Sequence, residues 1–407
     1  MNQNINRTFP RISELKDLLK FRKIELDARK RRLSRALTIW DLRDIAQRRT
    51  PQGPFDYTDG GSEREISLNR SRDIFRSIEF QPQILQDVST VDTRASVLGE
   101  SFALPVGIAP TGFTRMMHAE GELAGARAAE KFGIPFTLST LGTTSIEDVC
   151  LGAPQGSNWF QLYMWKDRDA SMKLVERARS CGVKNLVLTV DVPVAGARLR
   201  DIRNGLTVPP TISLRTIVDA LPRREWWWNF LTTKPLEFAS MSHWNGTVAE
   251  LLDFMFDPTM TPKDLTWLRK QWDGNLIVKG VQTLEDAKRV ARAGADAVIL
   301  SNHGGRQLDR APVPLLLVSE VSKELRKDLE VHVDTGIMSG ADVVAAIALG
   351  AKFTYIGKAY LYGLMAGGQE GVERALEIIK AEIIRTMKLL GVKDLSELNP
   401  KHVRFLH

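Results

Sequence analysis

The feature that most constrains this chain is an alternation of short apolar runs with helical stretches, which begins at residue 105 and repeats eight times. Each run is β-branched or otherwise apolar, and a turn of polar and small residues separates it from the helical stretch that follows. Apolar strands that alternate with helices are typical of a parallel sheet covered on both faces. We therefore predict strands at 105–110, 135–139, 158–163, 185–191, 275–281, 297–304, 330–336 and 353–360.

Eight such units are the number that closes a parallel sheet, so the expected fold is an α/β (β/α)8 TIM barrel. The length of 407 residues fits one barrel with insertions. With 43% hydrophobic and 26% charged residues, the composition excludes a disordered or collagen-like chain. We expect a basic N-terminal helical extension at 1–52 and the barrel at 53–407.

The cysteine content and the lengths of the apolar runs indicate the compartment in which the protein is found. The chain has 2 cysteines, Cys150 and Cys181, which are too few for a disulfide framework or a Cys-rich metal site. We therefore predict a reducing compartment and no metal. The N-terminus lacks the apolar core of a secretion signal, and no run of about 18 apolar residues occurs. The chain is expected on the cytoplasmic side.

The positive charge is concentrated near the N-terminus. The net charge is +7, and residues 1–52 alone hold 14 Lys and Arg against 6 Asp and Glu. The rest of the chain is therefore nearly neutral. The cluster could meet anionic lipid, nucleic acid or an acidic partner, or it could be a solvated helical surface. No aromatic residues interleave it, which disfavours single-strand nucleic-acid binding. Its members are Lys20, Arg22, Lys23, Arg29, Lys30, Arg31, Arg32 and Arg35.

A long insertion follows the fourth strand, and we assign 199–262 to a lid. It contains RREWWWNFL at 223–231, with three consecutive tryptophans. Trp226, Trp227 and Trp228 must point in different directions, so one core cannot easily bury them all. A membrane interface accepts such residues beside arginines. We expect 223–231 to contact the membrane surface, with packing inside the lid or between subunits as the alternative.

Polar residues interrupt the apolar runs where the strands end, and every predicted strand contributes at least one. A single polar residue at a strand end is usually only a cap. Because the C-terminal ends of barrel strands meet at one face, eight in register predict an active site there. These residues are Thr111, Ser139, Gln161, Tyr163, Thr189, Asp191, Lys279, Ser301, His303, Asp334, Gly357 and Lys358.

The stretch SNHGGRQLD at 301–309 places an imidazole and a guanidinium three residues apart, just beyond a buried strand. His303 could accept a proton, and Arg306 offers a bidentate fork to a carboxylate. A lone histidine is more often structural, but the nearby arginine and the strand-end position favour catalysis. Asp191 would orient His303 and stabilise its protonated form.

Lys279 ends an apolar strand, where a buried ammonium is costly unless an anion shares the site. A reduced flavin is such an anion, because negative charge develops on its pyrimidine side. The alternative is a lysine paired with a nearby acid. Neither a GxGxxG fingerprint after the first strand nor a P-loop is present, which disfavours a Rossmann domain and a nucleotide hydrolase.

From about Pro54 to the C-terminus, the chain resembles the FMN-dependent 2-hydroxy-acid dehydrogenase and oxidase family. The resemblance is strongest to actinobacterial quinone-dependent L-lactate dehydrogenases and extends to the basic N-terminal arm. The matching motifs are FDYTDGG (55–61), IAPTG (108–112), TLST (137–140), WFQLY (159–163), LTVDVPVAGARLRD (188–201), LIVKG (276–280), SNHGGRQLD (301–309) and YIGKAYLYG (355–363).

The resemblance implies roles for these residues. Tyr57, Arg198 and Arg306 would hold the substrate carboxylate, and Tyr163 would touch its hydroxyl. His303 would accept the hydroxyl proton as C2 delivers hydride to flavin N5; in the alternative, the C2 proton leaves first to give a carbanion. The residues implied to bind FMN are Pro110, Thr111, Gly112, Ser139, Gln161, Thr189, Lys279, Ser301, Asp334, Gly336, Gly357 and Lys358.

Two positions depart from the family pattern. Met338 and Ser339 stand where the family most often has an arginine pair, so the phosphate would rely on backbone N–H groups of this turn and of Gly357, with Lys358 in place of the usual arginine. Gly112 stands where the oxidases usually have alanine. Dehydrogenases and the lactate monooxygenase share glycine here, so this position leaves the electron acceptor open.

The resemblance implies oxidation of L-lactate to pyruvate, with membrane quinone as electron acceptor and a peripheral position at the membrane. Oxygen as the acceptor, or another L-2-hydroxy acid such as mandelate, is the alternative. A non-catalytic basic barrel that binds nucleic acid is an alternative from another class, and we expect no nucleic-acid partner. The family also implies a homotetramer.

Overall fold

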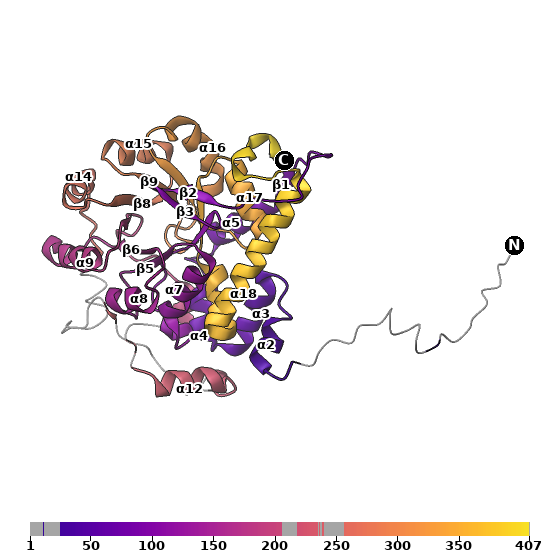
Figure 1. Ribbon diagram of the computed structural model, residues 1–407. Helices are drawn as coiled ribbons and strands as arrows, with labels where there is room; N and C mark the ends of the chain where they lie inside the picture. The colour runs from indigo at the N-terminus through magenta and orange to yellow at the C-terminus, as the bar shows by residue number, and fades with distance from the viewer. Residues whose placement is uncertain are drawn as a thin grey trace.

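The computed structural model describes residues 11, 25–205, 218–234, 236, 238–239 and 256–406. Its centre is a closed parallel barrel with the strand order β10-β11-β4-β5-β6-β7-β8-β9 (Figure 1), which confirms the predicted TIM barrel. In a typical pairing, Asn185 of one strand lies opposite Asn275 of the next. The strands are β4 (Val106–Ile108), β5 (Phe136–Ser139), β6 (Asn158–Leu162), β7 (Asn185–Thr189), β8 (Asn275–Val281), β9 (Ala297–Leu300), β10 (Glu330–Val333) and β11 (Phe353–Ile356).

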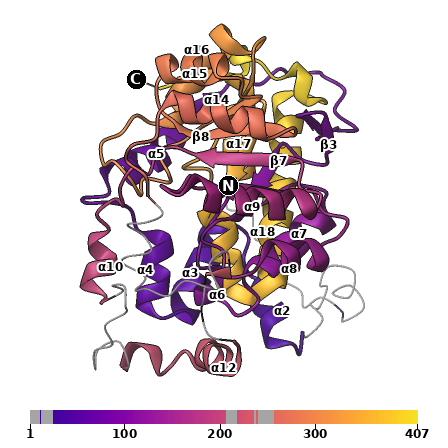
Figure 2. The same cartoon turned by 90° about the vertical axis from the view of Figure 1, so that its left-hand side faces the viewer.

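Helices surround this barrel (Figure 2). Their buried residues recur at helical spacing, as Leu174, Val175 and Ala178 do in α9, so each helix covers the sheet with one apolar face. Some of these helices end at a glycine; Gly133, for example, ends α7 in the left-handed conformation. The outer helices are α7 (Gly121–Phe132), α8 (Ile146–Gly152), α9 (Arg168–Ser180), α14 (Pro262–Gln271), α15 (Leu284–Arg292), α16 (Pro314–Leu325), α17 (Gly340–Ala348) and α18 (Lys358–Leu390).

Six of the eight strands end earlier than the apolar pattern predicts, and the difference is largest, at four residues, for the runs at 297–304 and 353–360. The run at 297–304 stops as a strand at Leu300, because His303, Gly304 and Gly305 all have positive φ angles and turn the chain away from the sheet. The run at 353–360 stops at Ile356, and α18 begins at Lys358. In both places the polar end of the predicted run forms the loop or helix start above the barrel.

A hairpin of β2 (Ala95–Val97) and β3 (Glu100–Phe102) covers the end of the barrel where the strands begin. The Phe102 ring lies 6.3 Å from that of Trp159 and 5.8 Å from that of Phe353, both inside the barrel. Trp159 and Phe353 are almost fully buried. This end is therefore filled by packed side chains, and an open site is confined to the opposite end.

Residues near the N-terminus pack on the barrel rather than apart from it. Helices α2 (Ala28–Leu33) and α3 (Ile39–Arg49) lie against α18, and Ile39 and Leu42 of α3 are fully buried. β1 (Ile78–Phe80) pairs with β12 (Val403–Phe405) near the C-terminus. The domain boundary at residue 52 stays a prediction, and Lys20, Arg22 and Lys23 of the basic cluster lie outside the described residues.

The remaining short elements complete the chain. Two short helices precede the barrel, α4 (Gln52–Asp59) and α5 (Ile66–Arg76), and a third follows the first barrel strand, α6 (Thr114–Met117). After the fourth barrel strand come α10 (Leu199–Arg203) and α12 (Arg224–Thr232). Two 3-10 helices, η2 (Leu395–Glu397) and η3 (Pro400–His402), precede β12. Much of the predicted lid at 199–262 lies outside the described residues.

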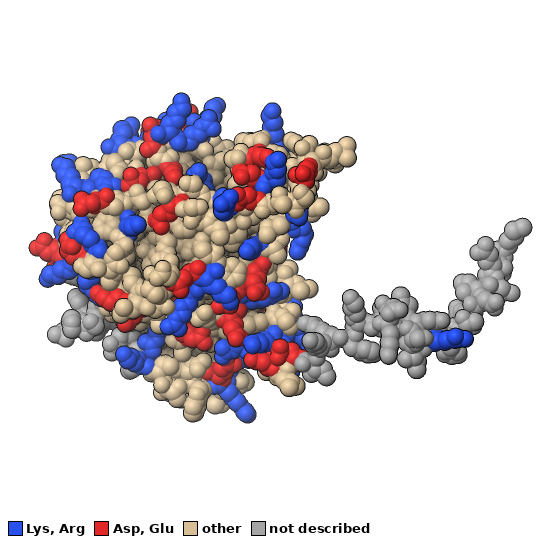
Figure 3. Space-filling model, viewed as in Figure 1, with Lys and Arg blue, Asp and Glu red and all other residues tan. Residues whose placement is uncertain are grey.

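Helix α12 carries the tryptophans and lies at the same end of the molecule as α2 in both ribbon views (Figures 1 and 2). Its Glu225 pairs with Arg49 of α3 and lies 3.3 Å from Arg29 of α2. Trp226 and Trp227 are half-buried, whereas Trp228 is 71% exposed. Charges of both signs are interspersed on the face shown in Figure 3. Among the described residues, no helix is both long and apolar enough to cross a membrane.

The carboxylate of Asp59 joins helices that are distant in the sequence. It accepts hydrogen bonds from Arg43 of α3 at 2.7 Å, Arg200 of α10 at 3.0 Å and Tyr362 of α18 at 2.7 Å. Burial alone would raise the pKa of Asp59, but the bonds from Arg43 and Tyr362 and the charge of Arg72 hold it well below its usual range. The buried acid is therefore charged and fully partnered.

We predict that Asp59→Asn lowers the free energy of unfolding by about 3 kcal/mol, because breaking a buried ion pair leaves its partners uncompensated. Urea unfolding followed by circular dichroism measures the change. The matched control is Glu79→Gln, which breaks the exposed pair with Arg404 and should cost less than about 1 kcal/mol. Equal losses in the two variants would contradict a central role for Asp59.

Candidate active site

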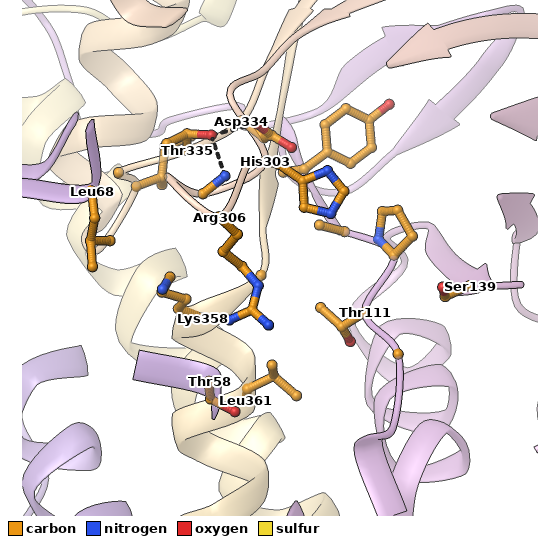
Figure 4. A pocket seen from close by; sticks show the side chains of 18 of the residues that line it. Thr58, Leu68, Thr111, Ser139, His303, Arg306, Asp334, Thr335, Lys358 and Leu361 are labelled. Carbon is orange, nitrogen blue, oxygen red and sulfur yellow. Dashed lines mark hydrogen bonds between the residues drawn. The ribbon is translucent and has the colours of Figure 1, made fainter. Parts of the chain in front are cut away.

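A cavity opens at the C-terminal ends of the barrel strands and encloses about 1040 Å³, part of it open to solvent (Figure 4). Asp191, Gln161, Thr189 and Ser301 do not line this cavity. The predicted site residues that line it are Tyr57, Pro110, Thr111, Gly112, Ser139, Tyr163, Arg198, Lys279, His303, Arg306, Asp334, Gly336, Gly357 and Lys358. The structure thus brings together residues that are up to about 300 positions apart in the sequence.

His303 and Asp191 form a hydrogen-bonded pair. The Nδ1 atom of His303 lies 3.0 Å and 3.2 Å from the two carboxylate oxygens of Asp191. The backbone N–H of His303 donates to Ser301 Oγ at 3.0 Å, which fixes the start of the turn. With Asp191 accepting at Nδ1, the proton of the neutral ring lies on Nδ1, and Nε2 is left as a proton acceptor.

The protonation of this pair follows from its burial. Burial lowers the pKa of His303, and the charge of Asp191, which acts in the opposite direction, does not restore it. Burial would raise the pKa of Asp191, but His303 and Lys279 outweigh that effect and keep it low. At neutral pH the pair is therefore a carboxylate beside a neutral imidazole, which suits a general base.

Two guanidinium groups converge on the ring of Tyr57. Arg306 lies 4.6 Å and Arg198 lies 5.5 Å from the ring centre. Arg306 donates a hydrogen bond to the backbone carbonyl of Tyr57, while Arg198 Nε is buried and has no partner among the described residues. Burial and the charge of Arg198 lower the pKa of Arg306 to about 10. Such concentrated positive charge favours an anionic ligand.

Lys279 is buried at the end of β8 and has partners on two neighbouring strands. Its Nζ donates to Ser301 Oγ at 2.9 Å and lies 3.1 Å from the Asp334 carboxylate. Burial opposes the charge, but Asp334 and Asp191 outweigh it and raise the pKa of Lys279. The alternative of a lysine paired with an acid is thus observed, and the same ammonium also lines the cavity.

Gln161, which is hydrogen-bonded to Ser139 of the cavity wall, carries a donor without a partner among the described residues. The Ser139 hydroxyl donates to Gln161 Oε1 at 3.0 Å. Gln161 Nε2 is buried without a partner among the described residues. A buried amide donor without an acceptor costs free energy, so it indicates a ligand that supplies one. Thr189, opposite Lys279 in the β7–β8 register, is also buried.

The turn after β10 approaches α5 closely. Gly336 has a φ of +85°, and a Cβ there would lie 2.0 Å from the carbonyl oxygen of Ser71, so only glycine fits. Lys358 donates to the carbonyls of Asp59 and Gly60 at 3.0 and 2.6 Å. Burial and the guanidiniums of Arg306 and Arg72 lower the pKa of Lys358 well below its usual range.

Several lining residues escaped the sequence analysis. Leu68 and Arg72 come from α5. Thr335 Oγ1 accepts a hydrogen bond from the Gly304 N–H at 3.2 Å and so helps to fix the turn after β9. These residues lie before the barrel or beside predicted ones and carry no strand-end signal of their own. Met338 lines the cavity as a buried side chain, and its N–H donates to Asp342, so that N–H is already engaged.

Comparison with known proteins identifies the family. The model for FMN-dependent dehydrogenases matches residues 46–405. The chain belongs to the FMN-dependent dehydrogenase family. Its cofactor is therefore FMN, as the sequence resemblance implied. The match covers the barrel strands and the residues around the cavity, and the family acts on small 2-hydroxy acids.

Relatives in bacteria point to a narrower group. A protein of Mycobacterium tuberculosis named "Putative L-lactate dehydrogenase" is 60% identical over 399 residues, which cover 98% of this chain and 96% of the relative. The L-lactate dehydrogenase of Vibrio cholerae is 40% identical over 366 residues, or 88% of this chain and 96% of the relative.

Solved structures of the family share the fold. Monotopic membrane (S)-mandelate dehydrogenase superposes with a TM-score of 0.88 and 38% identity, covering 91% of this chain and 100% of the other. A mandelate oxidase gives a TM-score of 0.78 and 35% identity, with 91% and 98% covered. The family therefore contains both dehydrogenases and oxidases on this barrel.

One glycine outside the predicted set lies directly against Asp191 of the His303–Asp191 pair. Gly280 has a φ of +104°, and a Cβ there would lie 2.6 Å from Asp191 Cγ. We predict that Gly280→Ala displaces Asp191 and lowers the rate at which a 2-hydroxy acid reduces the bound flavin about a hundredfold. Stopped-flow absorbance under anaerobic conditions measures this rate.

A matched control separates the clash from backbone strain. Gly99 also has a positive φ, +80°, but a Cβ there would meet nothing within 4 Å. Gly99→Ala therefore carries a similar backbone penalty without touching Asp191, and should keep the wild-type rate. If both variants lose activity equally, strain rather than the position of Asp191 explains the loss.

Proposed function

We propose that this dehydrogenase oxidises L-lactate to pyruvate and passes the electrons to a membrane quinone. The convergence of Arg198 and Arg306 near the neutral imidazole of His303, which is hydrogen-bonded to the Asp191 carboxylate, is the observation that carries the reaction type. The names of the relatives in Mycobacterium tuberculosis and Vibrio cholerae support lactate as substrate. The membrane-bound mandelate dehydrogenase supports a membrane acceptor.

In the proposed mechanism, the substrate carboxylate binds Arg306 and Arg198, which both lie close to the ring of Tyr57. Arg198 Nε has no partner in the part of the chain that the structure describes, and it can donate to a carboxylate oxygen. Tyr163 is buried, and this burial raises the pKa of its hydroxyl, which therefore stays protonated and can donate to the substrate hydroxyl. These contacts hold one enantiomer with its 2-hydroxyl facing His303.

His303 then takes the proton of the 2-hydroxyl at Nε2, and Asp191 stabilises the resulting imidazolium through Nδ1. FMN, when bound, supplies the two-electron acceptor for the substrate C2–H bond. Lys279, paired with Asp334 and Ser301, places a fixed positive charge where negative charge develops. The packed barrel interior below excludes water from this end of the site.

The residues that we propose to hold FMN fit its donors and acceptors. Gln161 Nε2 offers a buried donor that has no partner within the described ranges, and Lys358 is a buried cation whose charge a phosphate would restore. Arg72 adds a second cation at the cavity wall. The complete proposed set is Pro110, Thr111, Gly112, Ser139, Gln161, Thr189, Lys279, Ser301, Asp334, Gly336, Gly357 and Lys358.

The proposed membrane surface is the outer face of α12. Trp228 and Leu231 are 71% and 72% exposed, and neighbouring Phe230 is 40% exposed. Because exposed tryptophan beside arginine is typical of interfacial helices, we propose that this face inserts between lipid head groups. The protein would then lie peripherally on the cytoplasmic side, in contact with the quinone pool. The homotetramer stays a prediction.

The first test is anaerobic titration of the purified flavoprotein with L-lactate. We predict that L-lactate, unlike D-lactate, bleaches the visible flavin band, and that His303→Ala keeps the yellow colour but loses nearly all bleaching, because the base is gone. If mandelate bleaches the flavin and L-lactate does not, the substrate is mandelate rather than lactate. If hydrogen peroxide is the main product in air, the electron acceptor is oxygen rather than quinone. A fully active His303→Ala would overturn the mechanism.

The pH profile tests the electrostatics of the pair. Because the pKa of His303 lies below the ordinary 6.5, kcat/KM should hold at neutral pH and fall only on acidification below that value. Asp191 raises the pKa of His303, so Asp191→Asn should move this acid limb to still lower pH while reducing kcat. A limb that moves upward in the variant would show that Asp191 does not act on His303.

Vesicle binding tests the proposed membrane surface. Leu231→Ser combined with Trp228→Ser should weaken co-sedimentation with anionic phospholipid vesicles at least about tenfold, because two apolar side chains leave the interface. Leu389 is also 71% exposed but lies on α18, so Leu389→Ser serves as the control and should bind as the wild type does. Similar weakening in both variants would exclude a specific role for α12.

A further inference from the structure

A second hollow lies between α12 and α6, outside the cavity that holds the predicted catalytic residues. The space between its walls measures about 330 Å³, a figure that includes open solvent. α6 and the residues after it form one wall, and the inner face of α12 forms the other. Its lining includes Arg49, Met117, His118, Trp226, Phe230 and Met365.

His118 brings an unused hydrogen-bond donor to this hollow. The residue is 9% exposed, and its Nε2 is buried with no partner among the described residues. Its Nδ1 accepts the backbone N–H of Glu120 at 3.3 Å, which places the ring proton on Nε2. Burial lowers the pKa of His118, so the ring is neutral. A buried N–H without an acceptor indicates a ligand that carries one.

Aromatic rings form the opposite wall. The ring of Trp226 stacks on that of Phe230, with centres 4.9 Å apart and planes 11° apart. The indole N–H of Trp226 donates to the Met116 carbonyl at 2.8 Å and so holds α12 against α6. Trp228 and Leu231, on the same helix, are exposed. The hollow therefore lies directly beneath the proposed membrane surface.

The charges around the hollow favour a neutral ligand over an anion. Arg49 pairs with Glu225, which also lies 3.3 Å from Arg29. Arg115 donates to the backbone carbonyl of Lys234. Protein groups therefore already bind these positive charges. In the cavity with His303, by contrast, the guanidiniums of Arg198 and Arg306 lie close together.

A short covalent path connects the hollow with that cavity. Gly112 lines the cavity, and α6 begins two residues later at Thr114 and ends at Met117, directly before His118. Four helical residues span about 6 Å. Between them, the ring of Phe113 lies 6.1 Å from Tyr57 in an edge-to-face contact. The two sites are therefore neighbours on one short segment.

We propose that this hollow binds the head group of the quinone acceptor, with His118 Nε2–H donating to a quinone carbonyl and Trp226 packing on the ring. The inference rests on the proposed function. Oxidation of a 2-hydroxy acid to a 2-oxo acid releases two electrons and two protons, and reduction of a quinone to a quinol consumes the same number. A lipid-soluble tail would leave along the exposed face of α12.

The test measures quinone kinetics on the full-length holoenzyme without membranes. A short-chain ubiquinone analogue is the probe, with L-lactate as donor under anaerobic conditions. His118→Leu removes the donor, and Ala119→Met fills the hollow from a lining position. Both should raise the KM for the quinone about tenfold, as expected for one lost buried hydrogen bond or an equivalent clash. His118→Gln keeps an N–H donor and should recover most of the affinity.

A binding measurement supplies an independent readout. Quinones quench tryptophan fluorescence, so titration of the analogue against wild type and His118→Leu gives a dissociation constant without turnover. We expect the same tenfold weakening. Unchanged KM and quenching in both His118→Leu and Ala119→Met, with a wild type that reduces quinone, would overturn this site but leave the proposed function intact. A wild-type flavin that L-lactate does not bleach would instead overturn the proposed function.

Discussion

Closure of the parallel sheet is the constraint on which the rest of this structure depends. A parallel sheet leaves unpaired backbone groups at its edges unless it closes, and closure brings all C-terminal strand ends to one mouth. Residues separated by more than a hundred positions, such as Asp191 and His303, become hydrogen-bonded neighbours in this way. The β2–β3 hairpin fills the other end. The backbone topology therefore determines where in the barrel the active site can lie.

Within that mouth, the cations fall into two classes. Lys279 is neutralised by Asp334, and its charge is fixed by the fold. Arg198 and Arg306 instead both lie against the ring of Tyr57, and Lys358 is buried near other cations with a lowered pKa. The first class maintains a local potential in every state of the site. The second class carries positive charge that a bound anion must balance. Binding of an anion should therefore relieve the repulsion among these cations and stabilise this end of the barrel.

The sequence predicted the barrel because apolar runs and helical periodicity are local signals. It also predicted most of the cavity, because strand-end residues in a closed barrel must share one face. It could not predict Leu68 and Arg72, which reach the cavity from α5 only because Gly336 lets that helix approach. The role of Gly280 beside Asp191 was hidden for the same reason, since close contact between two strands leaves no trace in either segment. Strand lengths were overestimated where left-handed residues such as His303 end the extended chain.

The attachment of α12 rests largely on polar contacts. Glu225 bridges α2 and α3 through Arg29 and Arg49, and a single indole hydrogen bond ties Trp226 to α6. Ion pairs near a surface weaken as counterions accumulate, whereas the packed barrel does not respond to salt in this way. The helix that we propose to meet the bilayer is thus held in place by ion pairs, so we expect the ionic strength at the membrane surface to set how firmly α12 is attached to the barrel.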